Sequence, residues 1–286
     1  EPQKLARILE MMRFFVDRLG ARVLVMTATM PTPIRNLISD ILGNPELIRA
    51  TDETFAQFRR HRLCLRDAGL LTPPTISEIV ERAHRGEAVL CVATTVGRAQ
   101  QLQRALQKEL GEKSQVRLLH SRFTTEDRSA KEKALRELVA TDLKGKRPEQ
   151  VILVATQVVE VSLDVDFDVL FTDPAPLEAL IQRFGRVNRS RRPAPCDVIV
   201  CTPVDDSQPV YEKELVQAAI DQIRQIETPV IVDERHIQEM LDAIYSGPFG
   251  QLLAAQIEQE MKNFRRNVLD SITPFETNDS LESLFY

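Results

Sequence analysis

The sequence predicts an α/β fold, a parallel sheet flanked by helices, and two observations support this class. Short apolar runs alternate with amphipathic segments over residues 76–204, and the runs are apolar at nearly every position. Strands buried on both faces have this composition, and strand–helix alternation favours right-handed parallel connections. The predicted strands are Ala88–Ala93, Val116–Leu119, Val151–Ala155, Val169–Thr172 and Val198–Cys201.

Amphipathic segments between these strands predict the helices of the same domain. Residues 98–110 carry one apolar stripe, and the helix stops at Gly111. Residues 124–127 form a capping-box pattern that opens a helix through Leu138. A third helix, which Gly185 ends, has apolar residues at helical spacing: Leu177, Leu180, Ile181 and Phe184.

The flanking regions differ from this central domain. Residues 1–50 predict a helix at Leu5–Leu19, a strand at Arg22–Met26 and a second helix, which together are too small to bury a core. We interpret them as the end of a separate α/β domain. Residues 51–75 resemble a connector, and residues 205–286 are predicted to be mainly helical. The helices expected there are Tyr211–Ile226, Glu234–Tyr245 and Gln251–Leu269.

Composition limits the possible partners and the compartment. The 286 residues include 37 Lys+Arg and 42 Asp+Glu, so the net charge is −5 and any site for a polyanion must be local. No apolar run approaches the roughly 18 residues of a membrane span, and no signal-peptide pattern is present. The four cysteines favour buried thiols and a cytoplasmic protein. A local basic cluster lies within ten residues: Arg183, Arg186, Arg189, Arg191 and Arg192.

The most informative motif is the octapeptide Q-R-F-G-R-V-N-R at residues 182–189. Arg186 and Arg189, three positions apart and just past a helix end, can both point into a cleft that faces another domain. Guanidinium groups suit this place because they keep their charge and hold a fixed fork of donors. An arginine finger of this kind accelerates phosphoryl transfer by about 10³–10⁵. The alternative is a solvated basic helix end.

The pattern Q-R-x-G-R-x-x-R resembles motif VI of superfamily-two helicases. The resemblance implies two RecA-like lobes, of which this central domain is the second and residues 1–50 are the tail of the first. It implies that Gln182 approaches the γ-phosphate or its attacking water and that Arg186 and Arg189 are the fingers. Arg183 is grouped with the nucleotide-binding residues, where it supports the motif or the domain interface.

Residues 155–166, which follow a predicted strand, resemble motif V, whose loop contacts nucleic acid and nucleotide. By this resemblance Thr156 and Gln157 lie near the DNA backbone, and Ser162 and Asp164 lie near the nucleotide, with Asp164 close to the ribose. A threonine hydroxyl and loop amides after a parallel strand can bind phosphate without a buried unpaired charge.

Three further segments resemble helicase motifs. The T-A-T sequence at residues 27–29 resembles motif III, which couples hydrolysis to domain movement. Thr94 and Thr95 resemble motif IV, where a helix N-terminus can hold a backbone phosphate. His120 and Ser121 are expected to face the DNA; a structural role and a catalytic base are the alternatives for His120. The coupling residues are Thr27, Ala28 and Thr29.

Three acidic residues are interpreted as having no role in ligand or metal binding. We take Asp166 and Asp168 to be solvated residues of an acidic surface loop. Asp233 begins the sequence D-E-R-H, which is similar to a Mg²⁺-binding helicase motif but lies far after motif III. We therefore interpret Asp233 as a helix N-cap and predict no metal site in this chain.

Two elements of a complete motor are missing from the sequence. There is no G-x-x-x-x-G-K-[ST] loop, and no D-E-x-H precedes Met26. ATP and Mg²⁺ are therefore expected to bind mainly to the absent first lobe, so this chain alone is predicted to be inactive as an ATPase. No histidine is followed by aspartate, so the divalent metal of an associated nuclease would belong to another domain.

The joint pattern T-Q-V-V-E-x-S-L-D-x-D-F-D and D-P-A-P-L-E-A-L-I-Q-R-F-G-R-V-N-R resembles the CRISPR-associated type I interference helicase–nuclease family. The resemblance implies an ATP-dependent translocase on single-stranded DNA, recruited by an RNA-guided surveillance complex, that feeds a nuclease domain of the same protein. Val161 departs from the family, where a polar residue is expected. Another superfamily-two DNA or RNA helicase, or a non-catalytic RecA-like module that binds nucleic acid or a partner, remains open.

Overall fold

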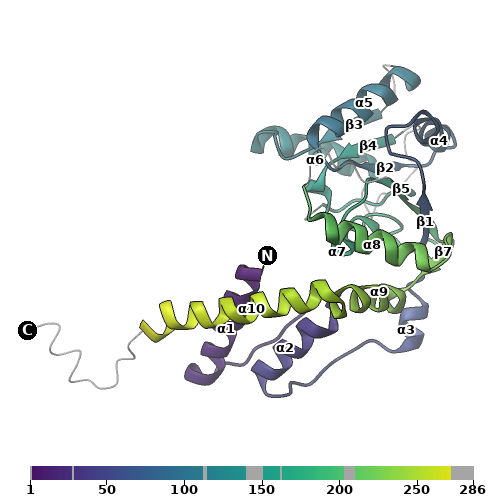
Figure 1. Cartoon of the computed structure of the whole chain (residues 1–286). Helices are drawn as coiled ribbons and strands as arrows, with labels where there is room; N and C mark the ends of the chain where they lie inside the picture. Colours follow the sequence, from purple (N-terminus) through teal and green to yellow (C-terminus); the bar gives the residue numbers. More distant parts are fainter. Residues whose placement is uncertain are drawn as a thin grey trace, which may run out of the picture. The chain divides into compact units, whose positions relative to one another are not determined.

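The computed structural model describes residues 2–27, 29–111, 115–139, 151–161, 163–202 and 210–271. The chain divides into two compact units. One comprises Glu1–Ile48 together with Tyr245–Tyr286, and the other comprises Arg49–Ile244. The last helix therefore belongs with the N-terminal helices, although it follows the larger unit in sequence (Figure 1).

The larger unit contains a seven-stranded sheet with the order β3-β4-β2-β5-β6-β1-β7. The pairs from β3 to β1 are parallel, and β7 is antiparallel to β1. The predicted α/β class with a parallel sheet is confirmed. The strands are β1 (His61–Arg66), β2 (Val89–Val92), β3 (Gln115–Leu119), β4 (Val151–Ala155), β5 (Val169–Thr172), β6 (Cys196–Cys201) and β7 (Val230–Val232).

Central strands β2, β4 and β5 are buried at every position, as their continuous apolar sequences predicted. Successive side chains of a strand point to opposite faces. Val89 and Cys91 pack in one core with Ile79 of α4 (Pro73–His84) and Leu102 of α5 (Val96–Leu110). Leu90 and Val92 are equally buried and face the other side. The remaining helices of this unit include α6 (Thr125–Val139), α7 (Leu177–Phe184) and α8 (Lys213–Gln225).

The predicted connector contributes a strand to the sheet. β1 lies between β6 and β7, with His61 opposite Cys196 and Leu63 opposite Val198. Its sequence, H-R-L-C-L-R, has three apolar residues between polar or charged ends and is not a continuous apolar run. Because such a short pattern is only half apolar, its place in the sheet depends on pairing with a distant partner strand.

Asp233 is the N-cap of α9 (Glu234–Ser246), as the sequence predicted. Its Oδ1 accepts hydrogen bonds from the backbone N–H of Arg235 at 3.0 Å and of His236 at 3.3 Å. Burial raises the pKa of the Asp233 carboxyl, but hydrogen bonds from Arg235 and His236 outweigh it and lower the pKa to about 2. The predicted apolar stripe of this helix is buried: Ile237, Met240, Leu241 and Ile244.

The smaller unit is helical in its described residues. It comprises α1 (Pro2–Leu19), α2 (Thr32–Leu42) and α10 (Pro248–Asn267), with a short 3₁₀ helix at Leu269–Ser271. α1 and α10 lie side by side, and buried Glu10 pairs with Arg265 at 2.9 Å (Figure 1). The core residues are Ala6, Leu9, Ile41, Ile257 and Met261.

The strand predicted at Arg22–Met26 does not form. Among the described residues these positions pair with no other strand, and Leu24 and Met26 are exposed. A strand needs a neighbour that takes up its backbone N–H and C=O groups. The apolar character of the segment was therefore not sufficient to make it a strand.

Gly250 in α10 lies where a side chain has no room. A Cβ at this position would overlap the backbone carbonyl of Tyr245. We expect Gly250→Ala to lower the unfolding free energy by about 1–3 kcal/mol, the usual effect of overpacking, in urea denaturation of the purified chain. Gly97→Ala in α5 is the matched control, because nothing lies within 4 Å of its Cβ and alanine favours a helix. Equal stability of the two variants would contradict this account.

Candidate functional site

The predicted DNA-contacting residues lie at the carboxyl ends of neighbouring parallel strands. Thr94 follows β2, His120 follows β3 and Thr156 follows β4, and these strands are adjacent in the sheet. Ligands of open α/β sheets bind at this edge. Contacts join the three loops, since the Gln157 side chain donates to the Thr94 carbonyl at 2.8 Å and the Thr156 N–H donates to Leu119 at 3.2 Å. The remaining predicted contacts, Thr95 and Ser121, lie directly next to these positions.

Thr94 and Thr95 are held by internal partners. The N–H of Thr94 donates to Asp173 Oδ2 at 2.9 Å, and its hydroxyl lies 3.3 Å from the same oxygen. Arg98 makes a two-pronged contact with Asp173, at 2.8 Å from both Nε and Nη2. The Thr95 hydroxyl caps α5 by accepting from the Arg98 N–H at 3.3 Å. The Thr94 amide therefore already has an acceptor, and its contact with a DNA phosphate stays a prediction.

His120 is packed into the lobe. Its ring stacks on Phe123 with centroids 4.1 Å apart, and its Nδ1 accepts from the Arg122 N–H at 3.3 Å. The Lys131 ammonium lies 4.5 Å from the Phe123 centroid. Burial lowers the pKa of His120, and the charges of Arg122 and Lys131 lower it further. The imidazole is thus neutral near pH 7, while the neighbouring Ser121 is exposed.

Motif VI begins on α7, where Gln182 is exposed and Arg183 is fully buried. The Arg183 guanidinium donates to Glu160 at 2.9 Å, to the Thr172 hydroxyl at 2.7 Å and to the Tyr211 hydroxyl at 3.0 Å. A guanidinium with these partners supports the motif from inside the lobe.

Arg186 joins motif VI to motif V. Its Nε donates to the carbonyl of Val159 at 2.7 Å, its Nη1 to that of Leu163 at 2.7 Å and its Nη2 to that of Glu160 at 2.8 Å. Only 9% of the residue is exposed. To reach a phosphoryl group the side chain would have to leave these carbonyls, so its role as a finger stays a prediction.

Arg189 is the motif VI arginine that reaches the surface. Its Nε lies 3.3 Å from Asp164 Oδ1, and the two side chains are 38% and 58% exposed. The predicted finger and the predicted ribose contact are therefore neighbours. Ser162 and Ala28 lie outside the described residues. Thr27 and Thr29 belong to the smaller unit, where the Thr27 hydroxyl donates to the Thr29 carbonyl at 2.7 Å.

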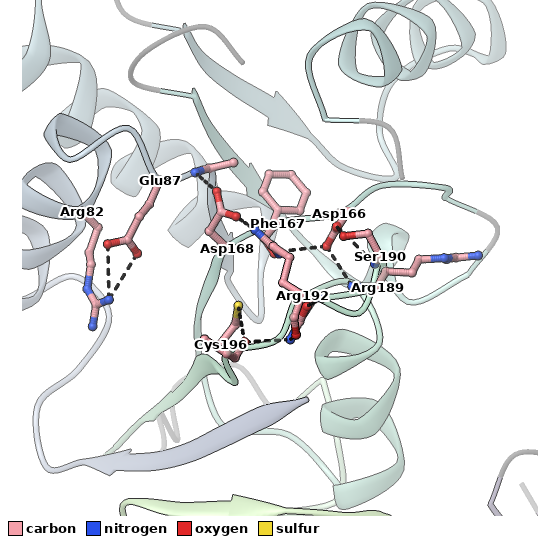
Figure 2. Close-up of polar contacts among 12 residues, drawn as sticks. Arg82, Glu87, Asp166, Phe167, Asp168, Arg189, Ser190, Arg192 and Cys196 are labelled. Atoms are coloured by element: carbon pink, nitrogen blue, oxygen red, sulfur yellow. Dashed lines mark hydrogen bonds and ion pairs between the residues drawn. The ribbon is translucent and has the colours of Figure 1, made fainter. Parts of the chain in front are cut away.

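The interpretation of Asp166 and Asp168 as solvated residues is wrong. Asp166 is fully buried and accepts from the N–H of Arg189 at 2.8 Å and of Ser190 at 3.2 Å (Figure 2). Asp168 accepts from the Ala88 N–H at 2.6 Å and pairs with Arg192. The nearby arginine cluster was the available indication, because buried carboxylates need cations or N–H donors.

Two other residues that the sequence did not identify shape the motif VI loop. Asn188 is buried with a φ of 50°, a left-handed conformation that asparagine tolerates. Its side chain donates to the carbonyls of Arg60 and Ala194, both at 3.2 Å. His61 on β1 donates from Nε2 to the Val187 carbonyl at 2.9 Å. The loop is thus fixed on both sides of Asn188.

No helix in the described part of the chain combines the length and apolar character needed to cross a bilayer. The same residues contain no group of three or more His, Cys, Asp or Glu side chains arranged to hold a metal ion.

The contact of His61 predicts a pH dependence of stability. Burial lowers the pKa of its imidazole from 6.5 to about 4, against the opposing effect of the bond to Val187. Below about pH 6.5 the unfolded chain takes up a proton that the folded chain does not, so stability falls as pH drops towards 4. His61→Gln keeps a donor without titrating, and we expect a smaller fall in the urea midpoint between these pH values. Exposed His84→Gln is the control, and a fall as large in His61→Gln as in the unmodified chain would refute the assignment.

The family model and the curated relatives that match this chain are all described as Cas3. Residues 85–192 match the family model described as CRISPR-associated nuclease/helicase Cas3, C-terminal. The chain is 52% identical over 91 residues to a Thermus thermophilus Cas3, covering 31% of this chain and 9% of that protein. It is 36% identical over 167 residues to the Escherichia coli Cas3, covering 57% and 18%. The chain spans between 9% and 30% of the length of the curated relatives compared.

Solved structures agree in fold. A crystal structure of T. fusca Cas3-ADP has a TM-score of 0.73 and 21% identity, covering 96% of this chain and 38% of that one. A chain of a CRISPR RNA-guided surveillance complex, pre-nicking, has a TM-score of 0.69 at 21% identity and covers 93% and 39%. These matches show that residues 85–192 carry a domain similar to the C-terminal part of Cas3 nuclease/helicases, and the larger unit has a RecA-like fold.

Proposed function

We propose that this chain supplies the second motor lobe of an ATP-dependent helicase of CRISPR interference that moves along single-stranded DNA. In the complete protein this motor would unwind target DNA and help to degrade it. One observation carries the proposal: the Arg189 guanidinium reaches the surface beside Asp164, on a loop that Arg186 binds to the neighbouring motif V loop. A rigid loop that presents one exposed guanidinium suits a group that must meet a phosphate held by another lobe.

ATP would bind between this lobe and a first lobe. Arg189 would stabilise negative charge on the γ-phosphoryl oxygens, which is the contribution of an arginine finger to phosphoryl transfer. Exposed Asp164 is able to accept hydrogen bonds from ribose hydroxyls. Crystal structures of the similar T. fusca Cas3 are described with AMPPNP, ADP and ATP. Mg²⁺ would be held mainly by the first lobe and by the phosphates, and a nuclease metal by a further domain of the same protein.

Single-stranded DNA would follow the carboxyl edge of the sheet. Thr95, Ser121 and Gln157 lie there, and the buried carboxylate of Asp173 organises the loop that contains Thr94. Polar side chains and loop amides contact phosphate and sugar without reading sequence, as a translocating motor requires. An RNA-guided surveillance complex is the proposed recruiting partner, because a structural neighbour is a chain of such a complex.

Substitution experiments should distinguish the roles of the motif VI arginines. We expect Arg189→Ala to reduce the kcat of DNA-stimulated ATP hydrolysis by about 10³-fold or more in the full-length helicase, with an unchanged melting temperature. Arg186→Ala should lower the melting temperature as well, because it removes the guanidinium donor from three backbone carbonyls, two of them in buried hydrogen bonds. Steady-state kinetics and thermal melting measure the two effects.

Arg85→Ala is the control, since it removes one positive charge from the same unit at a side chain that is 63% exposed. We expect it to retain turnover within about twofold, because surface substitutions of this kind have small effects. Near-normal turnover of Arg189→Ala would eliminate the finger assignment. A full-length protein without any DNA-stimulated hydrolysis would eliminate the motor function itself.

A further inference from the structure

We infer that Asp166 is the residue that positions the Arg189 guanidinium, through the hydrogen bonds that it accepts from the backbone N–H groups of Arg189 and Ser190. The inference rests on the proposed finger role of Arg189. It assigns a function to a buried carboxylate that lies in the motif V segment and contacts the motif VI loop.

Asp166 holds both peptide groups that flank the Arg189 Cα. Its Oδ1 accepts from the Arg189 N–H at 2.8 Å, and its Oδ2 accepts from the Ser190 N–H at 3.2 Å. The Ser190 hydroxyl donates to Oδ2 at 2.5 Å. Fixing the peptide on each side of one Cα fixes its φ and ψ, and therefore the direction in which its Cβ points.

This arrangement is an anion-binding turn whose anion is part of the protein. Successive N–H groups in a loop with left-handed residues form a concave site for a negative group. The loop has two such residues, Asn188 with a φ of 50° and Arg191 with a φ of 62°. A carboxylate from the same lobe fills the concave side, so the Arg189 side chain extends away from it, as Figure 2 shows.

Arg192 makes the buried charge of Asp166 tolerable. Its Nη2 lies 3.1 Å from Asp166 Oδ1 and donates to the Phe167 carbonyl at 2.5 Å. Its Nη1 pairs with Asp168. A buried carboxylate without such partners would be strongly destabilising. These partners hold the Asp166 carboxylate in one orientation.

The backbone of Asp166 is itself anchored. Its N–H donates to the Val139 carbonyl at the end of α6 at 2.8 Å. The next residue, Phe167, exchanges hydrogen bonds with the motif VI loop: its N–H donates to Arg186 at 2.9 Å, and its carbonyl accepts from Asn188 at 3.1 Å. The carboxylate thus reaches Arg189 from a rigid base, which a positioning residue requires.

Asp166→Asn tests this role because it keeps the shape and replaces one acceptor oxygen with a donor. That donor would face N–H or O–H groups of residues 189 and 190. A misplaced catalytic group can cost up to about 10²-fold in rate, so we expect kcat of DNA-stimulated hydrolysis to fall at least about tenfold with little change in KM for ATP. The control is Asp197→Asn, a buried carboxylate paired with Arg62 and Arg82, which should keep its kcat.

A double-mutant cycle separates positioning from general damage. If Asp166 acts through Arg189, Asp166→Asn should lower kcat in the unmodified protein and have no further effect in Arg189→Ala. Equal fold-losses in both backgrounds would refute the inference while leaving the finger role of Arg189 intact. Normal turnover of Arg189→Ala would instead refute the proposed function.

Amide hydrogen exchange on the chain gives a readout that does not depend on ATP hydrolysis. We expect Asp166→Asn to raise the exchange rates of the Arg189 and Ser190 amides by at least about tenfold, and Asp197→Asn to leave them unchanged. Unchanged rates in Asp166→Asn would overturn the inference. If that variant does not fold, Ser190→Ala removes the hydroxyl donor alone. We expect it to lower the kcat of DNA-stimulated hydrolysis by about two- to fivefold, and to have no further effect on kcat in the Arg189→Ala background. A loss that persists there would count against the inference.

Discussion

The hydrogen-bonded junction between the loop that follows β4 and the loop that follows α7 is the constraint on which the rest of the site depends. Arg186 from one loop donates to backbone carbonyls of the other, and Asp166 returns the contact by accepting backbone N–H groups. Both charged groups are buried, and burial of a charge is tolerated only when its hydrogen bonds are made. The two loops therefore behave as one body, whose shape is set before any ligand arrives.

The arginines around this junction look alike in sequence but have different partners in the structure. Arg183 is enclosed by polar groups of the lobe, Arg186 bridges the loops, and Arg192 neutralises carboxylates beneath them. Arg189 is left to extend from the surface beside Asp164. A guanidinium that must meet a ligand across a domain boundary gains from a rigid base, since the orientation is established in advance and little side-chain entropy is lost on contact.

The carboxyl edge of the sheet follows the same principle. Asp173, at the end of β5, accepts from the Thr94 amide and from Arg98, and so joins the loop after β2 to the start of α5. The Gln157 side chain then links that loop to the one after β4. In each case a buried or half-buried polar side chain is an internal hydrogen-bond partner for a backbone group of a loop. Loops that would otherwise be irregular become a defined surface on which sequence-independent contacts with a DNA backbone are possible.

The sequence by itself determined the α/β class, the central strands and the ends of helices such as α7, because these depend on local apolar periodicity and on capping residues. The motif sequences also predicted the resemblance to CRISPR-associated helicase–nucleases that the comparisons bear out. Only the tertiary structure decided that β1 joins the sheet, that Arg22–Met26 does not form a strand, and that Asp166 is buried. These outcomes depend on partners far apart in sequence, such as Arg62 and Asp197, 135 positions apart. A residue's burial and its hydrogen-bond partners are properties of the packed chain, so identical arginines and similar aspartates could not be told apart beforehand.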